Sequence, residues 1–113
     1  MKYVILIMDT ETGLRKSGAE QDAFMSEVMA WYDKWTGAGK VADGGHQLDS
    51  AAKARTVRAS GVTDGPFIEA KEVLGGFSVL ETDTIDEAVE IARTWPGVDR
   101  GWITVEVRPV VQY

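Results

Sequence analysis

The start of the chain sets the strictest condition on the fold. Residues 2–8 read Lys-Tyr-Val-Ile-Leu-Ile-Met, and apolar side chains fall on both alternating faces of this stretch. A strand that is apolar on both faces is normally covered on both sides, as a central strand of a sheet is. The run ends at Asp9, so it is shorter than the roughly 20 apolar residues of a membrane span. We therefore predict a central strand over residues 2–8.

Two helices are predicted further along the chain. The first spans residues 19–36 and carries an apolar stripe at helical spacing, formed by Phe24, Val28, Trp31, Tyr32 and Trp35 and widened by Met25 and Met29. The second spans residues 85–95, where Thr84 and Glu87 match a capping box. Pro96-Gly97 then ends it.

The remaining strands are predicted from alternating side chains and turn residues. Residues 41–48 form a weak strand with a bulge at Gly44-Gly45, and we expect it to pair with residues 53–59 through a turn near Asp49-Ser50. Residues 77–81 and 102–108 complete the set. In the last strand Ile103, Val105 and Val107 share one face.

Composition narrows the class of protein. The 113 residues are expected to form one domain over residues 1–113. The net charge of −6 argues against broad binding to nucleic acid or to anionic membranes. There is no cysteine, hence no disulfide framework, and no secretory cleavage site is visible, so we expect a cytoplasmic protein. Asp43, His46 and Asp49 match no metal-binding spacing, so no metal site is predicted.

The two faces of the predicted sheet differ in how they are covered. Two helices cover one face. The other face is too apolar in residues 2–8 to remain in water, yet its last strand carries Thr104, Glu106 and Arg108. We predict that this face packs on a second copy of the chain and leaves a partly polar cavity for a small-molecule ligand.

The segment after residue 60 carries a recognisable motif. It reads Thr-Asp-Gly-Pro-Phe at 63–67, Glu-Ala-Lys-Glu at 69–72 and Leu-Gly-Gly-Phe at 74–77, with Thr-Val-Arg at 56–58 upstream and Glu-Val-Arg-Pro-Val at 106–110 near the end. This arrangement resembles the DGPF group of the YCII-related proteins. The match spans about residues 50–110.

The resemblance implies a fold, an assembly and a range of activities. The fold is a ferredoxin-like α+β subunit with two helices on one face, which pairs into a dimeric α+β barrel. Some relatives are small lyase-type enzymes, including a dehydrochlorinase, and others are associated with sigma factors. YCII proteins proper carry a His–Asp dyad with the His on the first helix. Residues 19–36 contain no His, so that dyad is not carried over.

The candidate catalytic residues are His46 and Asp64. His46 is the only His of the chain, and imidazole is the side-chain type that can act as a general base near neutral pH, so it could take this role, oriented by Asp64. The alternatives are a structural imidazole beside the glycines and, for Asp64, a turn former that binds its own backbone.

The candidate ligand-binding residues are charged side chains of both signs. Lys71 could bind a carboxylate or phenolate while Glu69 exchanges a proton, and Arg58 with Arg108 could clamp an anion. The alternatives are an ion pair within the loop or between subunits for Glu69 and Lys71, and pairing of Arg108 with Glu106 or with an acid of a partner subunit.

Three functions remain open at this point. The first is a small enzyme without a cofactor that performs acid–base or elimination chemistry on a small polar or aromatic substrate. The second is a ligand-binding or sensory module tied to sigma-factor-dependent transcription control, acting without direct contact with nucleic acid. The third is a dimeric assembly protein without catalysis.

Overall fold

A computed structural model describes residues 1–10, 18–65 and 72–113 of the chain. Its elements, in chain order, are β1 (Lys2–Thr10), α1 (Gly18–Gly37), β2 (Val41–Gln47), the short 3₁₀ helix η1 (Ala51–Lys53), β3 (Arg55–Arg58), β4 (Gly61–Asp64), β5 (Glu72–Glu81), α2 (Ile85–Arg93) and β6 (Ile103–Pro109). None of the described helices is long and apolar enough to cross a membrane.

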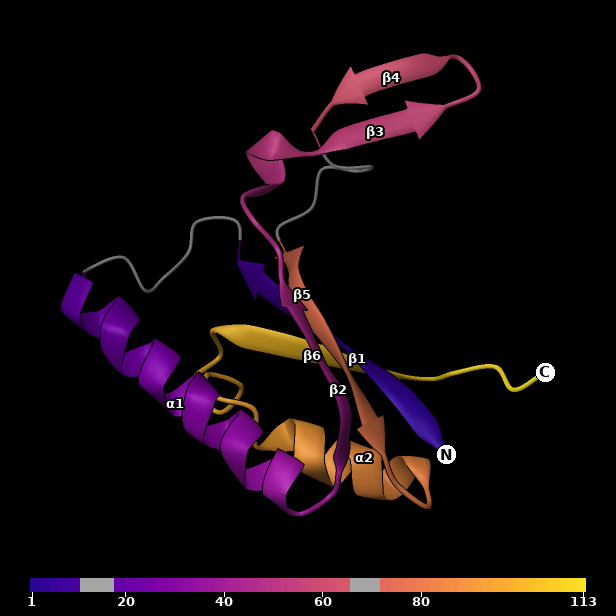
Figure 1. The fold of residues 1–113 in the computed structure, drawn as a ribbon. Coiled ribbons are helices and arrows are strands. Elements are labelled where there is room, and N and C mark those ends of the chain that lie inside the picture. The colour runs from indigo at the N-terminus through magenta and orange to yellow at the C-terminus, as the bar shows by residue number, and fades with distance from the viewer. Residues whose placement is uncertain (11–17, 66–71) are drawn as a thin grey trace.

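The main sheet has four antiparallel strands in the order β2-β5-β1-β6. β1 lies between β5 and β6, which confirms the prediction that the apolar start of the chain is an interior strand. With two helices and this strand order, the fold is the ferredoxin-like α+β arrangement that the sequence predicted (Figure 1).

The two faces of β1 are buried to different degrees. Tyr3, Ile5 and Ile7 are at most 5% exposed and pack into the core beneath the helices, whereas Val4 and Leu6 on the opposite face are only half-buried. The core is completed by apolar residues of the helices and the neighbouring strands, namely Phe24, Val28, Trp31, Leu80, Ala88, Ile91, Ala92, Trp95 and Ile103. Burial of this surface is the main force that holds the two layers together.

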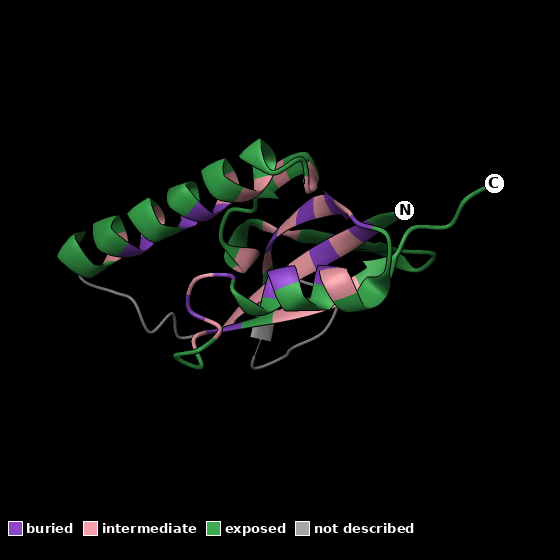
Figure 2. Cartoon of the chain, turned by 90° about the horizontal axis from the view of Figure 1, so that it is seen from below, coloured by how far each residue is buried: buried purple, intermediate pink, exposed green. Residues whose placement is uncertain are grey.

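Helix α1 contributes the apolar stripe that the sequence predicted, except for Met29. Phe24, Val28 and Trp31 are buried against the sheet, and Met25, Tyr32 and Trp35 pack partly buried beside them, whereas Met29 is 62% exposed. Figure 2 shows the buried residues on the inner side of α1 and its outer side exposed. Trp31 also donates a hydrogen bond from Nε1 to Thr94 Oγ1 at 3.0 Å, which links α1 to the end of α2.

The predicted pairing of residues 41–48 with residues 53–59 is wrong. β2 pairs with β5 in the main sheet, and β3 pairs with β4 in a separate two-stranded sheet. The chain does not reverse at Asp49-Ser50 because Ser50 caps η1, its Oγ accepting a hydrogen bond from Ala52 N at 3.2 Å. The predicted bulge is confirmed, since the register of β2 against β5 shifts between Asp43 and His46.

Helix α2 begins as the sequence predicted. Thr84 is the N-cap, and its Oγ1 accepts a hydrogen bond from Glu87 N at 3.2 Å. Glu87 Oε1 in turn accepts from Asp83 N at 3.1 Å, one residue earlier than in a standard capping box.

Candidate functional site

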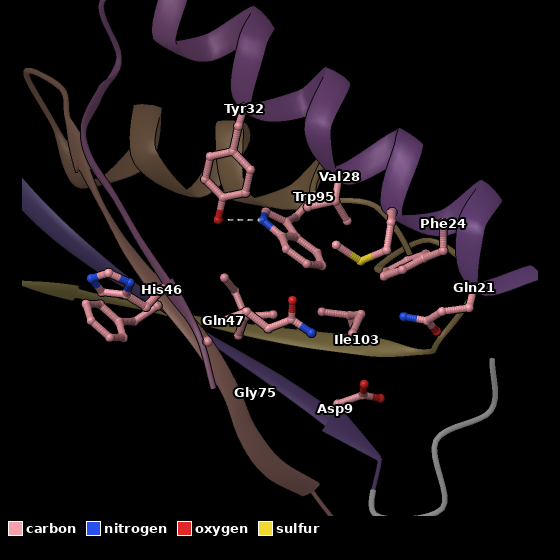
Figure 3. Close-up of a pocket in the computed structure, with 14 residues that line it drawn as sticks. Asp9, Gln21, Phe24, Val28, Tyr32, His46, Gln47, Gly75, Trp95 and Ile103 are labelled. Carbon is pink, nitrogen blue, oxygen red and sulfur yellow. Dashed lines mark hydrogen bonds between the residues drawn. The ribbon is translucent and has the colours of Figure 1, made fainter. Parts of the chain in front are cut away.

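A cavity of about 120 Å³ lies between α1 and the main sheet (Figure 3). Its walls are mainly apolar and aromatic. The lining comes from α1, from all four strands of the main sheet and from Trp95 after α2: Ile7, Asp9, Gln21, Phe24, Met25, Val28, Tyr32, His46, Gln47, Gly75, Gly76, Phe77, Trp95 and Ile103. An apolar cavity of roughly 150 Å³ is known to hold benzene, so this space suits a single small ring.

One glycine of β5 helps to open the cavity. Gly76 lies opposite Ile7 in the sheet and shares the face that the helices cover. It carries no side chain, and a Cβ there would approach His46 O to 3.0 Å. The sheet is therefore hollowed where a larger residue of β5 would otherwise fill the space below α1.

Polar side chains from three different elements lie toward one end of the cavity. Asp9 comes from β1, Gln21 from the first turns of α1, and Gln47 from the end of β2. Figure 3 shows the two amides directed into the cavity and the Asp9 carboxylate beside its opening. This end combines a proton acceptor with two groups that can each donate and accept hydrogen bonds.

A hydrogen-bonded cluster closes the other end. Trp95 Nε1 donates to the Tyr32 hydroxyl at 3.3 Å, and that hydroxyl lies 3.0 Å from Ser78 Oγ. Ser78 is fully buried in the sheet. The cluster satisfies polar groups that would be costly to bury alone and fixes the orientation of the Tyr32 ring.

His46 contributes to the wall of the cavity but its imidazole faces the other way. Figure 3 shows the His46 ring directed away from the cavity. Its centroid lies 6.0 Å from that of the Phe77 ring in an edge-to-face contact. The register pairs His46 with Phe77 and Phe77 with Leu6, which places the imidazole on the helix-free face of the sheet.

The other sequence-predicted site residues lie apart from this cavity. Asp64 is on the β3–β4 hairpin, where its 88% exposed side chain forms an ion pair with Arg55 Nε at 3.1 Å. Arg58 is on the same hairpin, 3.4 Å from Thr63 Oγ1. Arg108 is on β6 and pairs with Glu106. The structure therefore does not bring His46 to Asp64, or Arg58 to Arg108.

The two remaining candidates, Glu69 and Lys71, lie outside the described residues.

No three described acidic or imidazole side chains lie close enough together to hold a metal ion. Asp43 Oδ1 instead accepts a hydrogen bond from Gly45 N at 2.8 Å within the bulge, and Asp49 pairs with Lys53 at 2.9 Å.

Sequence reasoning missed Asp9, Gln21 and Gln47. Asp9 carries a usable signal, because it is the carboxylate that directly follows the apolar run of β1. The two Gln residues are ordinary surface residues in sequence, and only the packing of α1 over the end of β2 brings them together.

Comparison with known proteins identifies the class. The model of the YCII-related domain matches residues 1–113, and the chain belongs to this family. A relative in Rhizobium meliloti (strain 1021), described as an uncharacterised protein, is 31% identical over 117 residues, which cover 100% of this chain and 94% of the relative. Membership of the DGPF group stays a prediction.

A solved structure has a similar fold. It is the 5-chloro-2-hydroxyhydroquinone dehydrochlorinase TftG of Burkholderia phenoliruptrix AC1100, in complex with 2,5-dihydroxybenzoquinone. The TM-score is 0.56 at 17% identity, with 100% of this chain and 96% of that chain covered. At this identity the likeness supports the fold.

Proposed function

We propose that this YCII-related protein is a small enzyme that performs proton transfer or elimination on a small polar or aromatic substrate, in the cavity between α1 and the sheet. The observation that carries the proposal is that Asp9, Gln21 and Gln47 all line an apolar cavity of single-ring size. Cavities of this kind, with few polar groups in apolar walls, are typical ligand sites.

In this proposal Asp9 is the general base. Its carboxylate accepts a proton from the substrate, and the amides of Gln21 and Gln47 hold the polar substituents of the ring. Elimination from a chlorinated hydroxyquinol starts from its keto tautomer, in which one hydroxyl proton has moved to the ring carbon that bears chlorine. Asp9 then takes a second hydroxyl proton, and the electron pair of that O–H bond forms the new carbonyl. The chloride leaves with the electron pair of the C–Cl bond, and a hydroxyquinone remains. The structural neighbour acts on a chlorinated hydroxyquinol, which is a substrate of this class.

The role of Asp9 is tested with Asp9→Asn. We expect chloride release from 5-chloro-2-hydroxyhydroquinone to fall by about 100-fold or more, the usual range for loss of a general base. Asp33→Asn is the matched control, because Asp33 lies on α1, is exposed and does not line the cavity. Its turnover should equal that of the wild type.

Binding is measured separately with 2,5-dihydroxybenzoquinone. Because Trp95 lines the cavity, we expect the resonance of its indole N–H to shift on titration. Binding without chloride release would favour the ligand-binding module over the enzyme. Absence of both binding and turnover would overturn the proposal.

We also propose that the chain forms a homodimer through the helix-free face of the sheet. In support, this face carries Val4, Leu6 and Met8 of β1 beside Phe77 and Val79 of β5. All five are only half-buried in the single chain. A second copy would cover this apolar surface and would also enclose His46.

A further inference from the structure

The β3–β4 hairpin stands apart from the rest of the molecule. Its two strands pair with each other and not with the main sheet. Figure 1 shows it projecting beyond the end of the sheet where β2 finishes and β5 begins. The radius of gyration is 15.2 Å, against about 13 Å expected for a compact domain of this length. We call residues 51–65 the arm.

The arm carries an apolar pair that its own chain leaves in water. Val57 and Val62 lie opposite each other in the hairpin and are 76% and 63% exposed. The ion pair of Arg55 with Asp64 lies on the same face of the hairpin, two residues from the valine pair on the side away from the turn. A lone two-stranded hairpin is marginally stable in water, so a surface that covers this face would stabilise the arm.

The charge of the arm is opposite to that of the body. Residues 51–65 hold Lys53, Arg55 and Arg58 against Asp64, a net charge of +2. Because the whole chain carries −6, the residues outside the arm carry −8. The body of another copy is therefore an acidic partner for the basic arm, and charges of opposite sign favour and orient such an encounter.

We propose that the arm docks through Val57 and Val62 on the acidic body of a second copy of this chain, the same copy that covers the helix-free face in the proposed homodimer. The contact combines burial of the two valines with attraction between the arm and the body. It does not depend on what the cavity binds.

Sedimentation velocity of two matched variants tests the docking. Val57→Asp places a carboxylate in the contact and should weaken self-association by about tenfold or more. Ala59→Asp changes the charge equally at the exposed turn of the same hairpin, and should weaken it by less than about threefold. Wild-type association should also weaken between about 0.05 and 0.5 M salt. Equal association of the wild type and Val57→Asp, or a monomeric wild type, would overturn the proposal.

Photo-crosslinking identifies the partner surface even if Val57→Asp disturbs the arm. The chain contains no cysteine, so Val57→Cys can carry a single benzophenone label. Isotope-labelled and unlabelled chains are mixed before irradiation, and crosslinked peptides are read by mass spectrometry. We expect crosslinks that join the arm of one chain to the body of another. Crosslinks found only within single chains would show that the arm folds onto its own body, and would refute docking on a second copy.

Discussion

At the scale of the residue, two adjacent glycines have different structural roles. Gly45 adopts φ +66°, and a Cβ built there would lie 1.8 Å from the carbonyl oxygen of Phe77. Gly44 has neither restriction, since nothing lies within 4 Å of its Cβ position. Gly45 is the residue of the bulge that allows β2 to approach β5 closely. Gln47, two residues further along β2, lines the cavity.

This difference predicts the effect of two single substitutions. Gly45→Ala should lower the free energy of unfolding by at least about 2 kcal/mol, because the positive φ and the contact with Phe77 both oppose a Cβ. Gly44→Ala should change it by less than about 1 kcal/mol. Urea unfolding measures both values. Equal losses would show that the bulge does not depend on Gly45.

At the scale of the element, α2 is tied to the start of β2 by charge. Lys40 Nζ, one residue before β2, lies 2.9 Å from Glu87 Oε2 in the first turn of α2. The hydrogen bond from Lys40 lowers the pKa of Glu87 below its usual 4.5, and the same bond raises the pKa of Lys40 above 10.5. Both side chains are still about one-third exposed, at 32% and 36%, so water screens the pair and its contribution to stability is small.

The sign of the pH dependence follows from these shifts. A lowered Glu87 pKa stabilises the fold above pH 4.5, and this contribution is lost as the pH falls through the lower, folded value. A raised Lys40 pKa stabilises it below pH 10.5, and this is lost as the pH rises through the higher, folded value. At neutral pH both contributions are present.

Glu87→Gln should therefore flatten the acid side of the stability curve. Between about pH 6 and pH 3, the free energy of unfolding of the variant should fall less than that of the wild type. Glu90→Gln is the control on the same helix, where Glu90 faces Arg93 at 3.4 Å. Urea midpoints at several pH values provide the measurement. Parallel curves for the wild type and Glu87→Gln would contradict the assignment.

At the scale of the whole molecule, the two faces of the sheet serve different purposes. The helix side holds the core and the cavity. From the sequence we predicted a ligand cavity between two copies of the chain, on the helix-free side of the sheet. The cavity found in the single chain lies between α1 and the sheet. The helix-free side instead presents half-buried apolar residues with His46 and the Glu106–Arg108 pair around them.

The proposed dimer predicts the behaviour of Leu6→Lys. Leu6 lies in the middle of β1 on the helix-free face, so a lysine there should yield a monomer at concentrations where the wild type sediments as a dimer. Val89 lies on α2, away from this face, and is 37% exposed. Val89→Lys also introduces a lysine in place of an apolar residue, and this variant should remain dimeric. A dimeric Leu6→Lys protein would place the interface elsewhere.

Local sequence determined the features that depend on neighbouring residues. The apolar run of β1, the stripe of Phe24, Val28 and Trp31, and the cap at Thr84 each lie within one short window, so periodicity and capping chemistry were sufficient to find them. The interior position of β1 also follows from local sequence, because a strand that is apolar on both faces is normally covered on both sides.

Tertiary structure alone decided the partner of β2 and the composition of the cavity. Residues 41–47 and 53–59 alternate well enough to pair with each other, but β5 offers β2 a longer strand already held by β1. Asp9, Gln21 and Gln47 belong to three separate elements, and no local pattern relates them. Their meeting depends on how α1 packs across the sheet, which is set by burial of the whole core.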